Sequence, residues 1–197
     1  MTGITQVFRE GAGRLSLDFI RTLRRRGTPA AEEELPTPAA LAAWVHQLGP
    51  CRTPTTEPPS PRTLARAHEL REAVTVLLHA ACSAQGVTGC PADVREAVNL
   101  AAAEGAAPVP VLDAAGLLSW QAADPVAATL TLIARDALEL AASPLAHRLR
   151  ECRGDECACL FLDNSRPGSR RWCSMSSCGN QAKKAAFRER ERTGGGA

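Results

Sequence analysis

Cysteine is the residue type whose spacing in this sequence most clearly indicates chemistry. Cys152 and Cys157 are separated by four residues, as are Cys173 and Cys178, and residues 158–172 connect the two pairs. Two cysteine pairs joined by a connector of hairpin length are typical of four thiolates around one tetrahedral zinc ion. The sequence therefore predicts one Zn²⁺ bound by these four cysteines. A set of ordinary reduced cysteines, or a redox pair, is the alternative interpretation.

The predicted zinc site is structural, because four protein ligands leave no coordination position for a catalytic water. The roughly forty residues around it contain one Trp and two Phe. So small a segment buries too little apolar surface to fold alone, and metal binding would stabilise it by ~10 kcal/mol or more. Cys159 would point away from Cys157 on a strand, so we expect it not to be a ligand. Cys51, Cys82 and Cys90 are isolated, and Cys82 is expected to be a small buried residue of a long helix.

Basic residues follow the same cysteines. Between residues 166 and 192, eight Lys and Arg face only Glu189 and Glu191, a local excess of +6 that a zinc–tetrathiolate centre reduces by about two. On a helix after Cys178 several of them fall four residues apart and form one stripe, with Phe187 available to pack inward. Such a helix suits phosphate contacts and the major groove of DNA. The candidate nucleic-acid contacts are Arg166, Arg170, Arg171, Lys183, Lys184, Arg188 and Arg192. A solvated helix stabilised by its own ion pairs is the alternative.

Composition separates the chain into two parts. The 197 residues contain 23 Lys and Arg and 21 Asp and Glu, a net charge of +2. Residues 147–197 hold eleven basic and six acidic residues, so the last quarter carries +5 and the remainder −3. No apolar run is long enough to span a membrane, and the first residues lack a signal-peptide pattern. We therefore expect a cytoplasmic protein whose cysteines are reduced.

The part before the cysteines is predicted to be multihelical. Thr37, Ser60, Asp124 and Ser143 each precede a proline, the order of an N-cap residue and the first helical position. Apolar residues then recur at helical spacing after Pro61 and Pro125, and Pro91 opens a shorter helix. Four to six helices are expected.

Fewer segments show the pattern of strands. Residues 109–121 predict a hairpin with a turn at 114–116, and residues 15–19 fit a strand or the start of a helix equally well. Residues 52–61, with four prolines, predict a loop. In the cysteine-rich part, residues 159–163 and 170–173 predict a second hairpin followed by the basic helix. The expected fold is mainly α: a multihelical N-terminal domain with a small β-hairpin, then a four-cysteine zinc finger built from a β-hairpin followed by a helix.

The cysteine-rich segment resembles the CGNR zinc finger, a C-terminal module of bacterial proteins described as stress-induced transcription regulators. The matching residues are Cys152, Cys157, Leu160 to Asp163, Ser165-Arg166, Arg170 to Met175 and Cys178-Gly179-Asn180. Gln181 replaces the arginine that ends the motif, which would remove one phosphate contact if that arginine makes one.

The N-terminal part resembles the ABATE domain, the partner module of the same proteins. The matching residues are Leu17 to Ile20, Thr22, Leu35 to Pro38, Leu41, Trp44 and Gly49, while Arg21 stands where the family commonly has Asn. The resemblance implies an ABATE-like helical domain over residues 1–146, a CGNR-type finger over 147–192 and a flexible tail over 193–197. It also implies that the finger binds DNA.

We expect a DNA-binding regulator whose N-terminal domain senses a signal or forms a homodimer. A protein-interaction module with a purely structural zinc clasp is the alternative, and RNA is not distinguished from DNA as the ligand. We expect no enzymatic activity, because His68 and Glu72, the nearest approach to an acid–base pair, are better explained as neighbours on a helix surface. Asp18 is interpreted as a helix cap or ion-pair partner rather than a ligand-binding residue. Trp44 and Trp120 are expected in the core.

Overall fold

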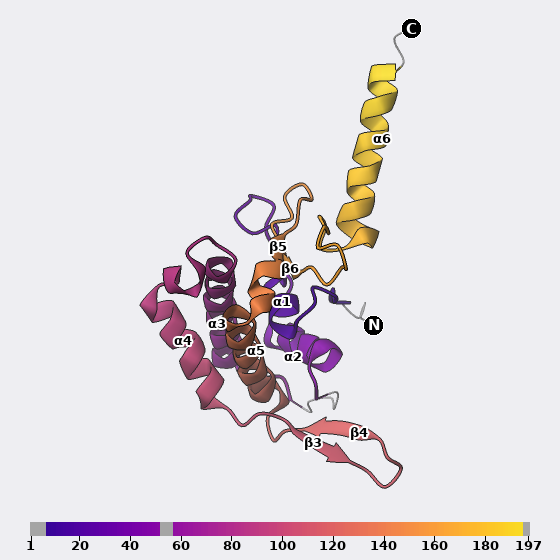
Figure 1. Ribbon diagram of the computed structural model, residues 1–197. Coiled ribbons are helices and arrows are strands. Elements are labelled where there is room, and N and C mark those ends of the chain that lie inside the picture. The colour runs from indigo at the N-terminus through magenta and orange to yellow at the C-terminus, as the bar shows by residue number, and fades with distance from the viewer. Residues whose placement is uncertain (1–6, 52–56, 195–197) are drawn as a thin grey trace.

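The fold is a helical body from which a hairpin and a helix project (Figure 1). The computed structural model describes residues 7–51 and 57–194. Helices α3 (Pro61–Ala81) and α5 (Pro125–Ala142) pack together, and α1 (Leu15–Ile20), α2 (Pro38–Leu48) and α4 (Ala92–Glu104) each pack against both. Trp44 of α2 is fully buried and its ring meets that of Phe19 edge-on at 5.3 Å, as expected for a core residue. Within the described residues, no helix is both long and apolar enough to cross a membrane.

The helices of the body begin where the proline-preceding residues predicted. The hydroxyl oxygens of Thr37 and Ser60 and the carboxylate of Asp124 each accept backbone N–H groups from the first turn of α2, α3 and α5. These bonds satisfy donors that have no partner inside the helix. Ser143 caps a short 3₁₀ helix, η2 (Pro144–Arg148), in the same way. A second 3₁₀ turn, η1 (Gly86–Gly89), separates α3 from α4.

The segment that fitted a strand or a helix equally well is helix α1. Its carboxylate, Asp18, accepts N–H groups from Ala12 at 2.9 Å and Gly11 at 3.3 Å and pairs with Arg21 at 3.3 Å. Asp18 therefore fixes the chain that leads into α1 and has the ion-pair role expected for it. Leu17 and Phe19 are buried on this short helix.

The strands form three separate antiparallel pairs: β1 (Leu23–Arg24) with β2 (Glu32–Glu33), β3 (Val109–Leu112) with β4 (Leu118–Gln121), and β5 (Leu149–Glu151) with β6 (Leu160–Leu162). The β3–β4 hairpin confirms the prediction for residues 109–121, and Asp113 closes its turn by accepting N–H groups from Ala115 and Leu117. It projects from the body (Figure 1). Trp120 of β4 is 38% exposed, so its predicted place in the core is wrong.

The hairpin predicted between residues 159–163 and 170–173 is wrong in its second strand. β6 pairs instead with β5, and residues 170–173 form no strand. The buried carboxylate of Asp163 accepts N–H groups from Ser165 and Arg170, both at 2.9 Å, which closes the connector as a loop. The predicted order of a hairpin followed by a helix is correct. One turn of π-helix, η3 (Met175–Gly179), leads directly into α6 (Asn180–Gly194).

The strands of the finger pack onto the body without a gap in the hydrophobic core. Leu160, Phe161 and Leu162 are buried in the same cluster as the apolar residues of α1 and α5. The Leu162 N–H donates to the Ala12 carbonyl at 2.8 Å. Gly13 allows this approach, because it has a φ of +102° and a Cβ there would lie 2.9 Å from the Leu162 Cβ.

Two sequence predictions concern residues near the edges of the described ranges. Of the predicted loop, residues 52–56 lie outside the described residues, and the rest precedes α3. A tail was predicted from residue 193, but α6 extends to Gly194, and residues 195–197 also lie outside.

Candidate metal centre and basic helix

The four paired cysteines meet at one point beside the body. The sulfurs of Cys152, Cys157, Cys173 and Cys178 all lie within 4.8 Å of one another. The Cys157 and Cys173 sulfurs are 3.7 Å apart, and those of Cys173 and Cys178 are 3.8 Å apart. Zinc–sulfur bonds of ~2.3 Å in a tetrahedron place neighbouring sulfurs ~3.8 Å apart. The arrangement fits one structural zinc ion.

The backbone around the cluster also suits thiolate ligands. The N–H groups of Gly154 and Cys173 donate to the Cys152 sulfur at 3.4 and 3.3 Å. A Cβ at position 154 would lie 3.0 Å from the Cys178 Cβ, so the turn after Cys152 needs a glycine to come this close. Such N–H groups orient a sulfur and stabilise its negative charge.

The pKa values of the clustered thiols indicate that a cation is needed for all four to ionise. Hydrogen bonding from Cys152 lowers the pKa of Cys157, whereas the same neighbour raises the pKa of Cys173. Burial raises the pKa of Cys178 to about 11. Four thiols this close cannot all ionise by themselves, because each thiolate disfavours the next. A divalent ion would supply the charge that allows all four sulfurs to bind as thiolates.

Arg21 brings a positive charge from the body to the cysteine cluster. Its side chain is buried and donates to the Glu10 carbonyl at 3.2 Å and to Asp18. Burial lowers the pKa of Arg21, but the negative charges of Cys159 and Cys173 in their thiolate form, together with Asp18, outweigh that effect and raise it. The sequence comparison marked Arg21 only as a departure from the family pattern. Its position beside the cluster depends on how α1 packs against the finger, which the sequence does not reveal.

The four remaining cysteines lie outside the cluster. The Cys159 thiol donates to the Leu160 carbonyl at 3.4 Å rather than joining the group of four. Cys51 and Cys90 are buried, and burial raises the pKa of each thiol. Cys82 is exposed at the C-terminal end of α3, so its predicted burial is wrong.

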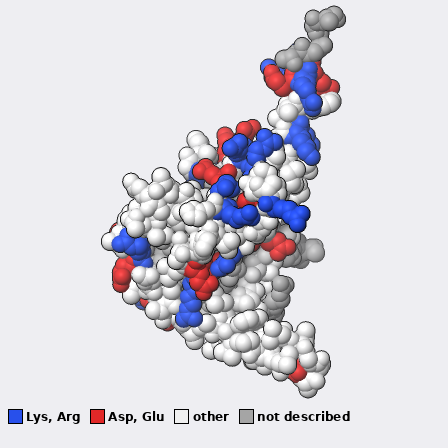
Figure 2. Space-filling model, viewed as in Figure 1, with Lys and Arg blue, Asp and Glu red and all other residues white. Residues whose placement is uncertain are grey.

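Helix α6 leaves the cluster and extends away from the body, as Figure 1 shows. It packs most closely with η3, the turn that precedes it and carries Cys178. Lys183, Lys184, Arg188 and Arg192 are all exposed on it. Phe187 is 55% exposed, so the expectation that it packs inward is wrong. Figure 2 shows Lys and Arg side chains along this helix, with acidic residues toward its far end.

The three arginines of the connector differ in whether their guanidinium groups are free to bind phosphate. Arg166 and Arg171 are exposed, and the Arg171 guanidinium stacks on the Trp172 ring at 4.3 Å. Arg170 instead donates to the carbonyls of Trp172 and Cys173 and lies 4.7 Å from the centre of the Phe161 ring. Because these contacts occupy its guanidinium, Arg170 supports the cysteine loop and is a poor candidate for binding phosphate.

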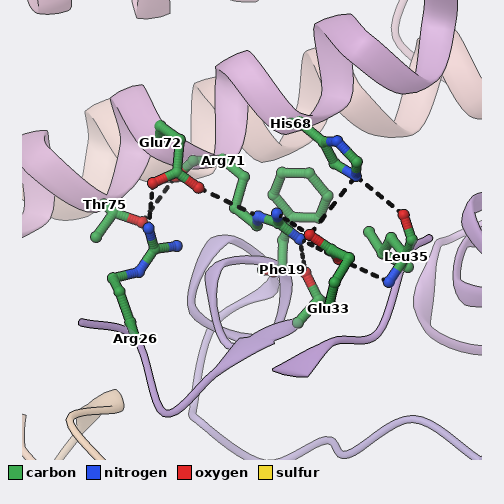
Figure 3. A network of polar contacts seen from close by, with 9 residues as sticks. Phe19, Arg26, Glu33, Leu35, His68, Arg71, Glu72 and Thr75 are labelled. Atoms are coloured by element: carbon green, nitrogen blue, oxygen red, sulfur yellow. Dashed lines mark hydrogen bonds and ion pairs between the residues drawn. The ribbon is translucent and has the colours of Figure 1, made fainter. Parts of the chain in front are cut away.

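A second polar cluster lies in the body, away from the cysteines. Figure 3 shows Arg71, buried to 3% side-chain exposure, bound to Glu33 through both of its terminal nitrogens. His68 contacts the Leu35 carbonyl at 2.9 Å, and Glu72 pairs with Arg26 rather than with His68. The neighbouring positions of His68 and Glu72 on α3 therefore make no acid–base pair. The cluster joins β2 to α3 and supports the fold.

A cavity of about 240 Å³ lies between the body and the cysteine cluster. The body lines it with Arg21, residues 24–26 and His79, and the finger lines it with Cys157 and Gln181 among others. A ligand in this cavity would therefore contact both the body and the finger.

Comparison with known families identifies both parts of the chain. The ABATE model, whose description reads "Putative stress-induced transcription regulator", matches residues 13–144. The model of the CGNR zinc finger matches residues 148–191. The two occur in the order that the sequence resemblance predicted. No curated protein matches the chain.

Proposed function

Because this chain belongs to the ABATE family and ends in a CGNR zinc finger, we propose that it is a DNA-binding transcriptional regulator. The observation that carries the proposal is helix α6, which is basic, exposed from Lys183 to Arg192 and extends away from the body in Figure 1. An isolated helix of this length is marginal in water, so a charged helix without a packing surface fits a role in binding a partner. The major groove of DNA admits such a helix.

The zinc ion would set the direction of α6. In this proposal the ion is held by Cys152, Cys157, Cys173 and Cys178. Because Cys178 lies in η3, the turn that leads into α6, fixing its sulfur at the ion would also fix the start of the helix. Arg166, Arg171, Lys183, Lys184, Arg188 and Arg192 would contact phosphates. Two of these residues lie on the connector and four on the helix, so the contacts would span the base and the length of α6.

The N-terminal domain would sense a signal, form a homodimer, or do both. The cavity between the body and the cysteine cluster supports a sensing role, because a ligand there would touch both parts. A DNA target would place the protein in the cytoplasm of a bacterium, where the thiols stay reduced. If the four cysteines hold zinc, the closed site would leave no position for a catalytic water, which supports a role without catalysis.

A salt titration of DNA binding tests the proposal. The zinc-loaded chain is mixed with labelled duplex DNA, and the affinity is measured by mobility shift or anisotropy between 50 and 200 mM salt, the range in which ~10³–10⁵ of affinity is lost by proteins with many phosphate contacts. Six phosphate contacts predict a slope of about −5 in a plot of log affinity against log salt. Zinc-loaded protein that fails to bind duplex DNA at the lowest salt would refute DNA binding.

A protein-interaction role is the second candidate, and exposed Phe187 favours it. This ring lies on α6 among Lys183, Lys184, Arg188 and Arg190, so the helix presents an apolar side chain amid positive charge. That surface would suit an acidic protein. Replacing Phe187 with Ala distinguishes the roles: phosphate binding would change little, whereas capture of an acidic partner would weaken. Competition between duplex DNA and double-stranded RNA addresses RNA as the ligand.

A further inference from the structure

The β3–β4 hairpin exposes an apolar surface that nothing in the described chain covers. Every residue of β4 is exposed, and β3 has no buried residue. Five of the large apolar side chains exposed on the described residues belong to this hairpin: Val109, Leu112, Leu117, Leu118 and Trp120. Their exposed fractions run from 38% to 68%.

The strand register gathers most of these side chains on one face. Pro110 lies opposite Trp120, and Leu112 lies opposite Leu118. Side chains alternate between the two faces of a strand, so these four residues form one face and alternate with Val109, Val111, Ser119 and Gln121 on the other. We call the first set, Pro110, Leu112, Leu118 and Trp120, the apolar face. It contains no polar side chain.

An uncovered hairpin of this kind is an unfavourable structure for an isolated molecule. A two-stranded hairpin is at best marginally stable in water. The four residues of the apolar face present on the order of 400 Å² of apolar surface, a size at which a patch on a monomer is often functional. A partner that covers the apolar face would stabilise the hairpin.

We propose that the apolar face binds the same face of a second copy of this chain, giving a two-fold symmetric dimer. The hairpin carries a single charged residue, Asp113, which lies in the turn with its carboxylate bound to Ala115 and Leu117. Figure 2 shows the projecting hairpin free of basic side chains. A face without charge can meet itself without repulsion, whereas it offers nothing to a charged protein or to nucleic acid.

The distribution of apolar residues also favours a symmetric contact. Two copies of the apolar face would together bury about 800 Å², the size of a small interface, so the dimer is expected to be weak. The other large exposed apolar residues of the described chain lie one to an element or segment: Val7, Val76, Leu100, Leu145, Met175 and Phe187. A contact between identical faces therefore matches the surface better than a head-to-tail contact.

Backbone pairing at the strand edges is less suitable than packing of the faces. The Asp113 N–H donates to the Leu117 carbonyl, so these two residues form a hydrogen-bonded pair. Bonded and non-bonded pairs alternate along the hairpin from there, which makes Leu112–Leu118 and Pro110–Trp120 non-bonded pairs. Pro110 and Trp120 accordingly direct their backbone groups outward. Pro110 has no N–H to offer, so only Leu112 directs an N–H outward from the edge of β3.

Sedimentation equilibrium of the full zinc-loaded chain tests the dimer without DNA. The proposed function explains why a regulator would dimerise, but the measurement itself needs no DNA. A failure to dimerise is therefore distinguishable from a failure to bind DNA. We expect a weak dimer with a dissociation constant on the order of tens of micromolar. Leu118→Asp should raise the dissociation constant at least ~100-fold, because the symmetry would bring two carboxylates into one apolar interface.

Val109→Asp is the matched control. Val109 is as exposed as Leu118 but lies on the opposite face, so this substitution should change dimerisation no more than a few-fold. Zinc content and circular dichroism confirm that both variants are folded. A wild-type chain that stays monomeric at about 100 µM would overturn the proposal, as would equal weakening by the two substitutions.

Discussion

The two projections of this molecule, hairpin β3–β4 and helix α6, have opposite surfaces. Both extend from the helical body in Figure 1. The hairpin presents an apolar face and a single charge, whereas every residue from Lys183 to Arg192 of α6 is exposed and most of them are charged. Surfaces this different indicate different partners, an apolar one for the hairpin and an anionic one for the helix.

The two projections also differ in what supports them. The hairpin is connected to α4 and α5 at its two ends and is built by its own strand pairing. Helix α6 is attached at one end, to the turn that carries Cys178. The metal centre should therefore govern the helix and leave the hairpin unaffected. The predictions below test this separation, beginning with the largest expected effect.

Removal of the metal should have the largest effect. Structural zinc in small fingers contributes ~10–16 kcal/mol of apparent binding energy at neutral pH. Chelation, or Cys173→Ser, should abolish DNA binding and melt much of the region from Cys152 onward. The helices of the body should keep most of their signal in far-ultraviolet circular dichroism. Self-association through the hairpin, measured on the same samples, should persist. Loss of self-association together with DNA binding would show that the two projections are not independent.

Charge reversal on α6 should come next. Replacement of Lys183, Lys184 and Arg188 with Glu should lower affinity for duplex DNA by at least ~100-fold and reduce the salt slope by about three, because each lost phosphate contact removes about one. Zinc content, stability and dimerisation should not change. Arg62→Glu is the control, since Arg62 is exposed on α3 in the body. An unchanged DNA affinity in the triple variant would instead favour the protein-interaction role.

Features that depend on local chemistry could be predicted from the sequence. The proline-preceding caps determine where helices begin, because one side chain satisfies donors two or three residues away. The cysteine spacing likewise anticipated the cluster, since each pair spans a single turn of chain. The 109–121 hairpin was predictable from its strand pattern and the turn between.

Features that depend on distant contacts could not be predicted. The partner of β6 is β5 because Asp163 binds the Ser165 and Arg170 N–H groups and closes the connector as a loop. Trp120 was placed in the core because large aromatic residues are usually buried, yet it lies on the projecting hairpin and is 38% exposed. Arg170 counted as one more charge in the sequence, but nearby carbonyls hold it. In each case the deciding partner is identified only by the fold.

A substitution in the body should lower the stability of the fold without changing what the hairpin and α6 bind. Glu33→Gln leaves the guanidinium of Arg71, which is 3% exposed, without its charged partner. Breaking such a pair should reduce the free energy of unfolding by about 2 kcal/mol, less than for a fully buried pair because Glu33 is 30% exposed. Denaturant unfolding measures the loss. DNA affinity and dimerisation of the folded variant should match the wild type, and a selective loss of either would connect the body cluster to that projection.

Removal of the charge on Arg21 should affect the metal centre modestly. Its guanidinium lies beside the cysteine cluster, where it offsets part of the negative charge of a zinc–tetrathiolate centre. Arg21→Met should weaken zinc about tenfold in competition with a colorimetric chelator, the lower end for residues that support metal ligands. Arg21→Lys keeps the charge and should recover part of the affinity. Equal zinc affinity in the wild type, Arg21→Met and Arg21→Lys would mean that the charge of Arg21 does not stabilise the metal centre.

The smallest expected effect is the pH dependence of the stability that Glu33→Gln loses, measured as the free energy of unfolding. Burial raises the pKa of Glu33, but its bonds to Arg71 and the Leu35 N–H outweigh that effect and hold it below the ordinary value of about 4.3. A carboxyl group with a lowered pKa stabilises the folded state above its ordinary pKa and loses that contribution as the pH falls. The stability difference between wild type and Glu33→Gln should therefore narrow from pH 6 toward pH 3, although zinc dissociates from both proteins in acid. Dimerisation should stay constant between pH 7 and 6, because the apolar face has no group that titrates there. A stability difference that widens in acid would show that Glu33 is not stabilised as a carboxylate.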